Sequence, residues 1–220
     1  MDRAAKTGRS SYSSRAAGEF WSRRVKSTDQ LSAVLSYSAP KQLNLLYDQW
    51  ERQVFAQLLP RPLRGKRALD IGAGVGRISI MLAKLGAEVV SVDISGEMLK
   101  RLKRNATRLR VTNRISIIQG TSYEIPIKGH SCDLVTCVGV LEHLPEDVRA
   151  ATVLEAARLV KRSGRIYMVV NNTENPFLSR NYPLKRQRRD GYFVSLVGLS
   201  WLRRLCRKAR MTLTVRAATP

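Results

Sequence analysis

The residues best suited to chemistry are three closely spaced glycines and two acids. Gly72, Gly74 and Gly76 occur at every second position after Asp70, and Asp93 follows at the end of the next apolar run. Glycines with this spacing let the backbone turn tightly and approach a ligand with no Cβ in between. A carboxylate such as Asp93 can accept from both hydroxyls of a ribose, each bond contributing about 1.5 to 3 kcal/mol. The pattern predicts a site for a nucleoside.

A strand, a turn, a helix and a second strand must position these groups. Residues 68–71 have the composition of a buried parallel strand, and residues 88–93 form a second apolar run. Between them, helical spacing (i, i+3, i+4, i+7) relates Ile78, Met81, Leu82 and Leu85. Open α/β sheets bind ligands at the carboxyl ends of their strands, so the glycine turn and Asp93 are expected at one edge.

Glycine spacing separates two classes of cofactor. A dinucleotide site uses G-x-G-x-x-G and holds a pyrophosphate at a helix N-terminus, whereas the third glycine here comes one residue earlier. The stretch resembles motif I, D/E-x-G-x-G-x-G, of the class I S-adenosylmethionine-dependent methyltransferases. The resemblance implies S-adenosyl-L-methionine as cofactor and a Rossmann-like, doubly wound, mostly parallel α/β sheet. A nicotinamide cofactor is the less favoured alternative.

The resemblance covers roughly residues 63–172. C-D-L-V at 132–135, L-E-H at 141–143 and E-A-A-R-L-V-K-R-S-G-R-I-Y at 155–167 match family segments. In the adenine-binding loop Gly120 matches, but Thr121 and Ser122 replace the family's acid and alanine. T-C-V-G-V-L-E-H and the N-terminal helix add a narrower resemblance to the O-methyltransferases of ubiquinone biosynthesis.

The resemblance also implies roles for individual residues. His143 is the one residue near the site whose ordinary pKa suits a general base near neutrality; the alternative is a histidine that orders its loop by bonding to backbone. Arg52, just before the first strand, could meet the methionine carboxylate or lie exposed. The expected cofactor-binding residues are Asp70, Gly72, Ala73, Gly74, Gly76, Asp93, Ile94, Thr121, Ser122, Val138 and Arg52.

Composition divides the chain into three parts. Residues 1–27 form a basic arm, expected to be disordered, and residues 28–62 a helical lid. Residues 63–220 form the methyltransferase domain, in which 171–200 faces the substrate and carries a basic cluster beside an apolar stretch. Residues 211–218 are expected to form a sixth strand. The seventh, antiparallel strand usual in the family is missing, which suggests truncation or pairing through another chain.

Overall composition limits the function. The 220 residues, 44% of them hydrophobic, suffice for one α/β core without a membrane span. The three cysteines have neither metal-binding spacing nor an even number, which favours a reducing, cytoplasmic setting and no metal site. The net charge of +22 gathers in residues 61–110 and 161–220. Such a field attracts anionic membrane surfaces, acidic substrates or nucleic acid.

The expected reaction is transfer of a methyl group to an oxygen, or less readily a nitrogen, of a small-molecule acceptor that is acidic or lipid-like. Methylation of nucleic-acid amino bases is disfavoured, because no N/D-P-P-Y/F follows the fourth strand. Methylation of RNA at a ribose or a wobble base stays open. So does a truncated domain that binds cofactor without turnover.

Overall fold

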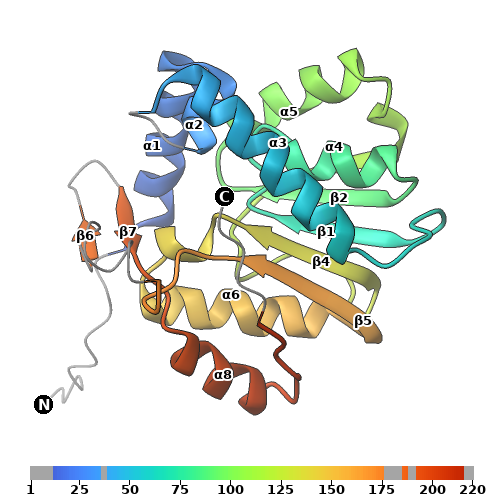
Figure 1. The fold of residues 1–220 in the computed structure, drawn as a ribbon, viewed down its shortest axis with the longest axis vertical. Coiled ribbons are helices and arrows are strands. Elements are labelled where there is room, and N and C mark those ends of the chain that lie inside the picture. Colours follow the sequence, from blue (N-terminus) through green and yellow to red (C-terminus); the bar gives the residue numbers. More distant parts are fainter. Residues whose placement is uncertain (1–11, 36–38, 176–184, 188–191, 216–220) are drawn as a thin grey trace, which may run out of the picture.

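A computed structural model describes residues 12–35, 39–175, 185–187 and 192–215. Its main sheet has five parallel strands in the order β3-β2-β1-β4-β5 (Figure 1). They are β1 (Arg67–Ile71), β2 (Glu88–Asp93), β3 (Ile115–Gln119), β4 (Cys132–Val138) and β5 (Val160–Val169). The order reverses between β2-β1 and β4, which is the switch point where such sheets bind ligands. The doubly wound α/β fold expected from the sequence is therefore confirmed.

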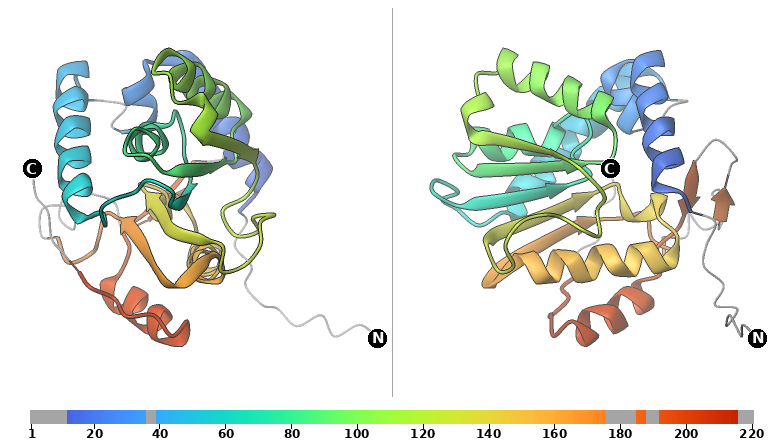
Figure 2. Two further views of the ribbon diagram at one scale, coloured as in Figure 1. Left: turned by 90° about the vertical axis from the view of Figure 1, so that its right-hand side faces the viewer. Right: turned by 180° about the vertical axis from the view of Figure 1, so that it is seen from behind.

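Helices cover both faces of this sheet. Helices α3 (Lys41–Leu58), α4 (Arg77–Lys84) and α5 (Gly96–Arg108) lie on one side, and α6 (Glu146–Leu159) and α8 (Leu199–Lys208) on the other (Figure 2). The central strands are buried on both faces, so Leu69, Ile71 and Val135 are completely enclosed. No helix in the described part of the chain is both long and apolar enough to cross a bilayer.

The N-terminal arm differs from expectation. Residues 1–27 are expected from the sequence to be disordered, and residues 1–11 lie outside the described residues. Within the described part, α1 (Ser14–Ser27) is a helix that stands across the carboxyl ends of the strands (Figures 1 and 2). Ser13 caps its first turn by accepting from Ala16 N. Ala17 and Val25 are buried on one face of the helix. Packing of this face stabilises the helix despite its high Ser and Arg content.

Two further helical segments complete the layer next to α1. A short helix, α2 (Gln30–Val34), follows it, and the long α3 begins after Pro40. Both lie within residues 28–62, for which the sequence indicates helices. A small antiparallel pair, β6 (Lys185–Gln187) and β7 (Phe193–Ser195), lies within the expected substrate-facing segment.

The expected sixth strand is not formed over its described part. Residues 211–215 carry no strand, and 216–220 lie outside the described residues. Met211 and Leu213, like Trp201 and Leu205 of α8, are partly buried and pack against the apolar cluster that contains Leu202 and Cys206. Their apolar surface is thus partly covered without strand pairing, and in the described chain the main sheet ends at β5.

Candidate active site

A cavity opens at the carboxyl ends of β1, β2 and β4, where the sequence predicts a ligand. It is walled by the glycine turn, the end of β2, the loop after β3, the segment after β4, and α1 and α2. Of the predicted site residues it brings together Asp70, Gly72, Ala73, Gly74, Asp93, Ile94, Thr121, Ser122, Val138 and His143. Gly76 and Arg52 are not among the lining residues.

Asp93 is fixed at the centre of this cavity by backbone donors. Its Oδ2 accepts from Gly74 N at 2.8 Å, and its Oδ1 accepts from Ser95 N at 2.8 Å. Each oxygen has a second lone pair, so the carboxylate can still accept from two neighbouring hydroxyls. Desolvation by burial raises the pKa of Asp93 to about 6, although the two backbone bonds oppose that rise. This geometry suits a ribose whose hydroxyls both donate.

Asp70 supports the glycine turn through hydrogen bonds to neighbouring elements. Its Oδ1 accepts from Thr136 Oγ1 at 2.7 Å and its Oδ2 from Ser79 Oγ at 2.5 Å. Ser91 Oγ donates to Ser79 in turn. Asp70 is 2% exposed, and burial raises the pKa of its carboxyl. These bonds tie β1, α4 and β4 together beneath the glycines, which gives Asp70 an anchoring position besides its place in the cavity wall.

The segment after β4 is a short 3-10 turn, η2 (Leu141–His143), held by a buried arginine. Arg149 of α6 donates through Nε to Leu141 O at 2.8 Å and through Nη2 to Leu144 O at 2.9 Å. His143 Nδ1 lies 2.9 Å from Phe193 O, which can only accept, so Nδ1 carries the proton. Nε2 is left with a lone pair. Burial lowers the pKa of His143 to about 4, so the ring is neutral near pH 7.

Helix α1 forms a wall of the cavity that was not expected from the sequence. Its Trp21 packs edge-on against His143 with ring centroids 4.9 Å apart. Gly18 crosses the end of β2 so closely that a Cβ there would lie 3.2 Å from Ile94 O. Ser22 Oγ and Ser95 Oγ are 2.8 Å apart. The helix therefore closes the cavity above Ile94 and beside His143.

An ionic cluster beside the glycine turn was also not predicted from the sequence. Arg77 follows the last glycine, lines the cavity, and pairs through Nε with Asp48 Oδ1 at 2.6 Å and through Nη2 with Glu51. Arg52, expected near the methionine carboxylate, instead pairs with Asp48 at 2.7 Å, and the Arg52 side chain is 44% exposed. The signal in the sequence was a basic residue directly after motif I and acids spaced i, i+3 on the preceding helix.

The remaining predicted residues divide between cavity and support. Thr121 lies in the cavity wall. Ser122 also lines the cavity, and its Oγ lies 2.7 Å from Thr152 Oγ1 of α6. Val138 ends β4 at the cavity. Gly76 faces the core instead, since a Cβ there would lie 2.8 Å from Leu102 Cγ.

Comparisons with known proteins show what the central part of this chain is similar to. A family model described as a methyltransferase domain matches residues 69–168, from β1 through most of β5. Residues 69–168 thus match a methyltransferase domain, in agreement with the class I S-adenosylmethionine-dependent type that the glycine turn resembles. A ubiquinone biosynthesis O-methyltransferase of Xanthomonas oryzae is 34% identical over 118 residues, which cover 52% of this chain and 47% of that protein. One from Xylella fastidiosa is 36% identical over 120 residues, covering 53% and 47%.

A solved structure gives the same result for the fold of this chain. Magnesium protoporphyrin IX methyltransferase from Synechocystis, crystallised with bound S-adenosylhomocysteine, superimposes with a TM-score of 0.62 at 25% identity. The match covers 77% of this chain and 75% of that one. Against the curated relatives, by contrast, the matching segment spans about half of their length.

The raised pKa of Asp93 predicts a pH dependence for binding of S-adenosylhomocysteine to this chain. Ribose hydroxyls need the ionised carboxylate, so the affinity for S-adenosylhomocysteine should fall by up to about tenfold per pH unit below about pH 6. The folded protein alone has the opposite trend from this group: a raised pKa favours folding at low pH, and that contribution is lost as pH rises through about 6.

Calorimetric titrations from about pH 5 to about pH 8 would measure the change in affinity. Near pH 6, binding should release protons, which buffers of different ionisation enthalpy detect. A flat affinity across this range, with no proton release, would contradict the assignment of Asp93 as a hydroxyl acceptor.

Proposed function

We propose that this domain binds S-adenosylmethionine in the cavity and transfers its methyl group to an oxygen of a small-molecule acceptor. The observation that carries the proposal is Asp93, held by Gly74 N and Ser95 N with a free lone pair on each oxygen. The relatives named as ubiquinone biosynthesis O-methyltransferases support an oxygen acceptor. The three cysteines are free and buried, which supports our expectation of a reducing, cytoplasmic setting.

The residues present fit this cofactor. Asp93 would hold the ribose, and Thr121, Ser122 and Tyr123 lie where the adenine is expected. At the glycine turn a side chain would collide, because a Cβ on Gly72 would lie 2.2 Å from Val140 Cγ2. The cofactor supplies an electrophilic methyl group. Arg77 lines the wall beside the turn and would face the carboxylate end, although Asp48 and Glu51 already neutralise it.

The protein's part in the reaction is alignment and removal of a proton. A methyl acceptor must lie about 3 to 3.5 Å from the reacting carbon, in a site closed to water. Trp21 of α1, which packs against His143, and Val140 both provide apolar surface in the cavity wall. The unprotonated Nε2 of His143 could take the proton of a hydroxyl acceptor. Its pKa of about 4 makes it a weak base, so its effect should be largest for acidic hydroxyls such as phenols.

Two substitutions at His143 separate catalysis from loop ordering. In His143→Asn, the amide nitrogen can replace Nδ1 as the donor to Phe193 O, but no group replaces Nε2. If His143 is the base, both His143→Asn and His143→Ala lower kcat by about a hundredfold with little change in KM for cofactor. If it only orders the loop, His143→Asn keeps nearly full activity and His143→Ala alone loses stability.

The experiment that tests the function is methyl transfer from labelled S-adenosylmethionine to a panel of phenols, catechols and carboxylic acids by the full chain. Label in an acceptor, absent with Asp93→Ala, supports the proposal. Cofactor binding without transfer to any acceptor of the panel would count against turnover, and transfer to RNA in preference to the panel would move the acceptor to a nucleic acid.

A further inference from the structure

The first half of helix α3 has its polar and apolar sides reversed. Asn44, Asp48 and Glu51 are buried, spaced i, i+4, i+7 along the face that points inward. Leu43, Leu45 and Leu46 point outward and are 55%, 48% and 64% exposed. Surface helices of globular proteins normally bury the apolar stripe. Leu43 and Leu46, spaced i, i+3, are neighbours on the helix surface. Exposed apolar neighbours of this kind mark a surface that contacts something else.

The inward acids have a structural explanation. Asp48 and Glu51 both pair with Arg77 at the glycine turn, and the Asn44 side chain donates to Ser32 Oγ of α2. These bonds fix which side of α3 faces the protein. The ion pairs therefore place the leucines on the outer side of the helix. The protein does have an apolar core beneath α3, because Phe55, further along the same helix, is only 2% exposed.

The outward side of this half-helix carries no acidic group. Besides the leucines, its exposed residues are glutamines and the cations Lys41 and Arg52. The acids at this end of the molecule are engaged: Glu97 pairs with Lys26 and Lys100, and Asp29 accepts from Leu31 N and Ser32 N at the start of α2. The surface therefore offers apolar area with Lys41 at one end and, at the other, Arg52, whose charge is shared with Asp48.

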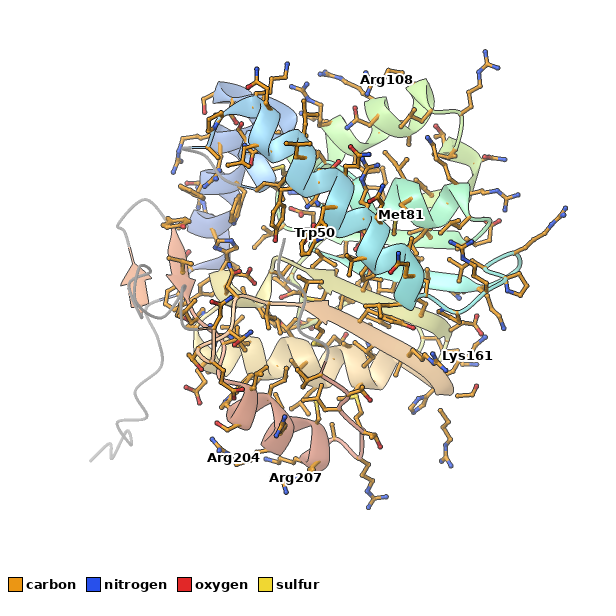
Figure 3. The ribbon with its side chains drawn as sticks, viewed as in Figure 1. Trp50, Met81, Arg108, Lys161, Arg204 and Arg207 are labelled. Carbon is orange, nitrogen blue, oxygen red and sulfur yellow. The ribbon has the colours of Figure 1, made fainter. Side chains whose placement is uncertain are left out.

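Positive charge alone would not distinguish the end of the molecule where α3 begins from other surfaces. Figure 3 shows Arg108 at the tip of α5 and Arg204 and Arg207 on α8, all directed away from the protein at opposite ends of the molecule. Basic side chains thus cover several surfaces of a chain whose net charge is +22. The leucines of α3 distinguish one of them. Figures 1 and 2 place the start of α3 at the same end as α2 and α5.

We propose that the exposed leucines of α3, with the cations around them, dock this protein onto an anionic lipid surface. Helices that lie in a membrane interface combine Leu and Trp on one face with Lys and Arg beside it. Each cation near an anionic leaflet adds roughly 1 kcal/mol of attraction. Symmetric pairing of two copies through α3 would instead bring Lys41 and Arg52 of each copy together, and nucleic acid would leave the leucines without an apolar partner.

The test is flotation of the full chain with vesicles. Phosphatidylcholine mixed with phosphatidylglycerol should carry the protein upward, and phosphatidylcholine alone should carry much less; added salt should weaken the binding. The double substitution Leu43→Gln/Leu46→Gln should lower the partition coefficient by about tenfold or more. Leu154→Gln on α6, a leucine that is 41% exposed on the other side of the sheet, is the matched control and should bind like the wild type.

Circular dichroism and S-adenosylhomocysteine binding of each variant separate loss of docking from loss of folding, and the assay needs no methyl transfer, so it stands apart from the proposed activity. Equal flotation of the double variant and the wild type would overturn the assignment to α3. Absence of binding to anionic vesicles would overturn the proposal, as would a wild-type dimer that fails to float and becomes monomeric in the double variant.

Discussion

Replacing Asp93 with alanine should lower the affinity for S-adenosylhomocysteine by about a hundredfold or more. Two charge-assisted bonds of about 1.5 kcal/mol or more each are lost, and about 1.4 kcal/mol corresponds to a factor of ten. The loss includes a second part, because Gly74 N and Ser95 N lose their acceptor and the turn loses a constraint. Isothermal titration calorimetry measures the affinity directly.

The matched control is Asp133→Ala. This carboxylate lies at the opposite end of the sheet, where it accepts from Arg67 N and pairs with Lys161 at 2.9 Å. Its loss removes two partners just as the loss of Asp93 does, but away from the cavity. Cofactor affinity should stay within about twofold of wild type. Weak binding by both variants would point to a general loss of folding, and tight binding by Asp93→Ala would remove Asp93 from the site.

The centre of the site could be predicted because its parts are close together in the chain. The first strand, the glycine turn, α4 and the second strand run from Arg67 to Asp93 without an insertion, and the strands are buried on both faces. Burial on both faces produces unbroken apolar runs, and turns that need positive φ select glycine. Both signals are visible in a short window of sequence.

The wall of the site could not be predicted, since it depends on contacts between distant segments. Ser22 meets Ser95 across 73 residues, and Arg77 meets Asp48 across 29. In residues 14–27, three apolar residues at a spacing of four (Ala17, Trp21 and Val25) are hidden among Ser and Arg. Composition therefore indicates disorder, while the packing of Val25 beside Met98 decides the structure.

At the C-terminal segment, by contrast, the sequence pattern predicts a strand that the described residues 211–215 do not form. Met211, Leu213 and Val215 alternate with threonines, which is the pattern of a strand with one buried face. Alternation states which side chains prefer burial but not whether a neighbouring strand is available. Packing of Met211 and Leu213 against the cluster that contains Leu202 and Cys206 partly meets the same preference without strand pairing to β5.

The glycine turn gives the second large effect. Gly72→Ala should destabilise the fold by about 2 to 4 kcal/mol, of which about 1 comes from its positive φ and the rest from overpacking. The φ of Gly72 is 70°, and an added Cβ would lie 2.2 Å from Val140 Cγ2. Chemical denaturation measures the loss. Affinity for S-adenosylhomocysteine should fall as well, because Val140 and Gly139 line the cavity.

Two further variants divide that loss into its causes. Gly65 has a similar φ of 76° with nothing within 4 Å of an added Cβ, so Gly65→Ala should cost only about 1 kcal/mol. Val140→Ala removes the two methyl groups that block residue 72. Added to Gly72→Ala it should restore stability relative to the sum of the two single changes, a coupling of about 1 to 3 kcal/mol. Additive losses, or equal losses at Gly65 and Gly72, would show that Val140 does not set the close approach. Coupling would mean that Val140 requires glycine at position 72, and that the segment after β4 and the glycine turn act as one unit in shaping the cofactor cavity.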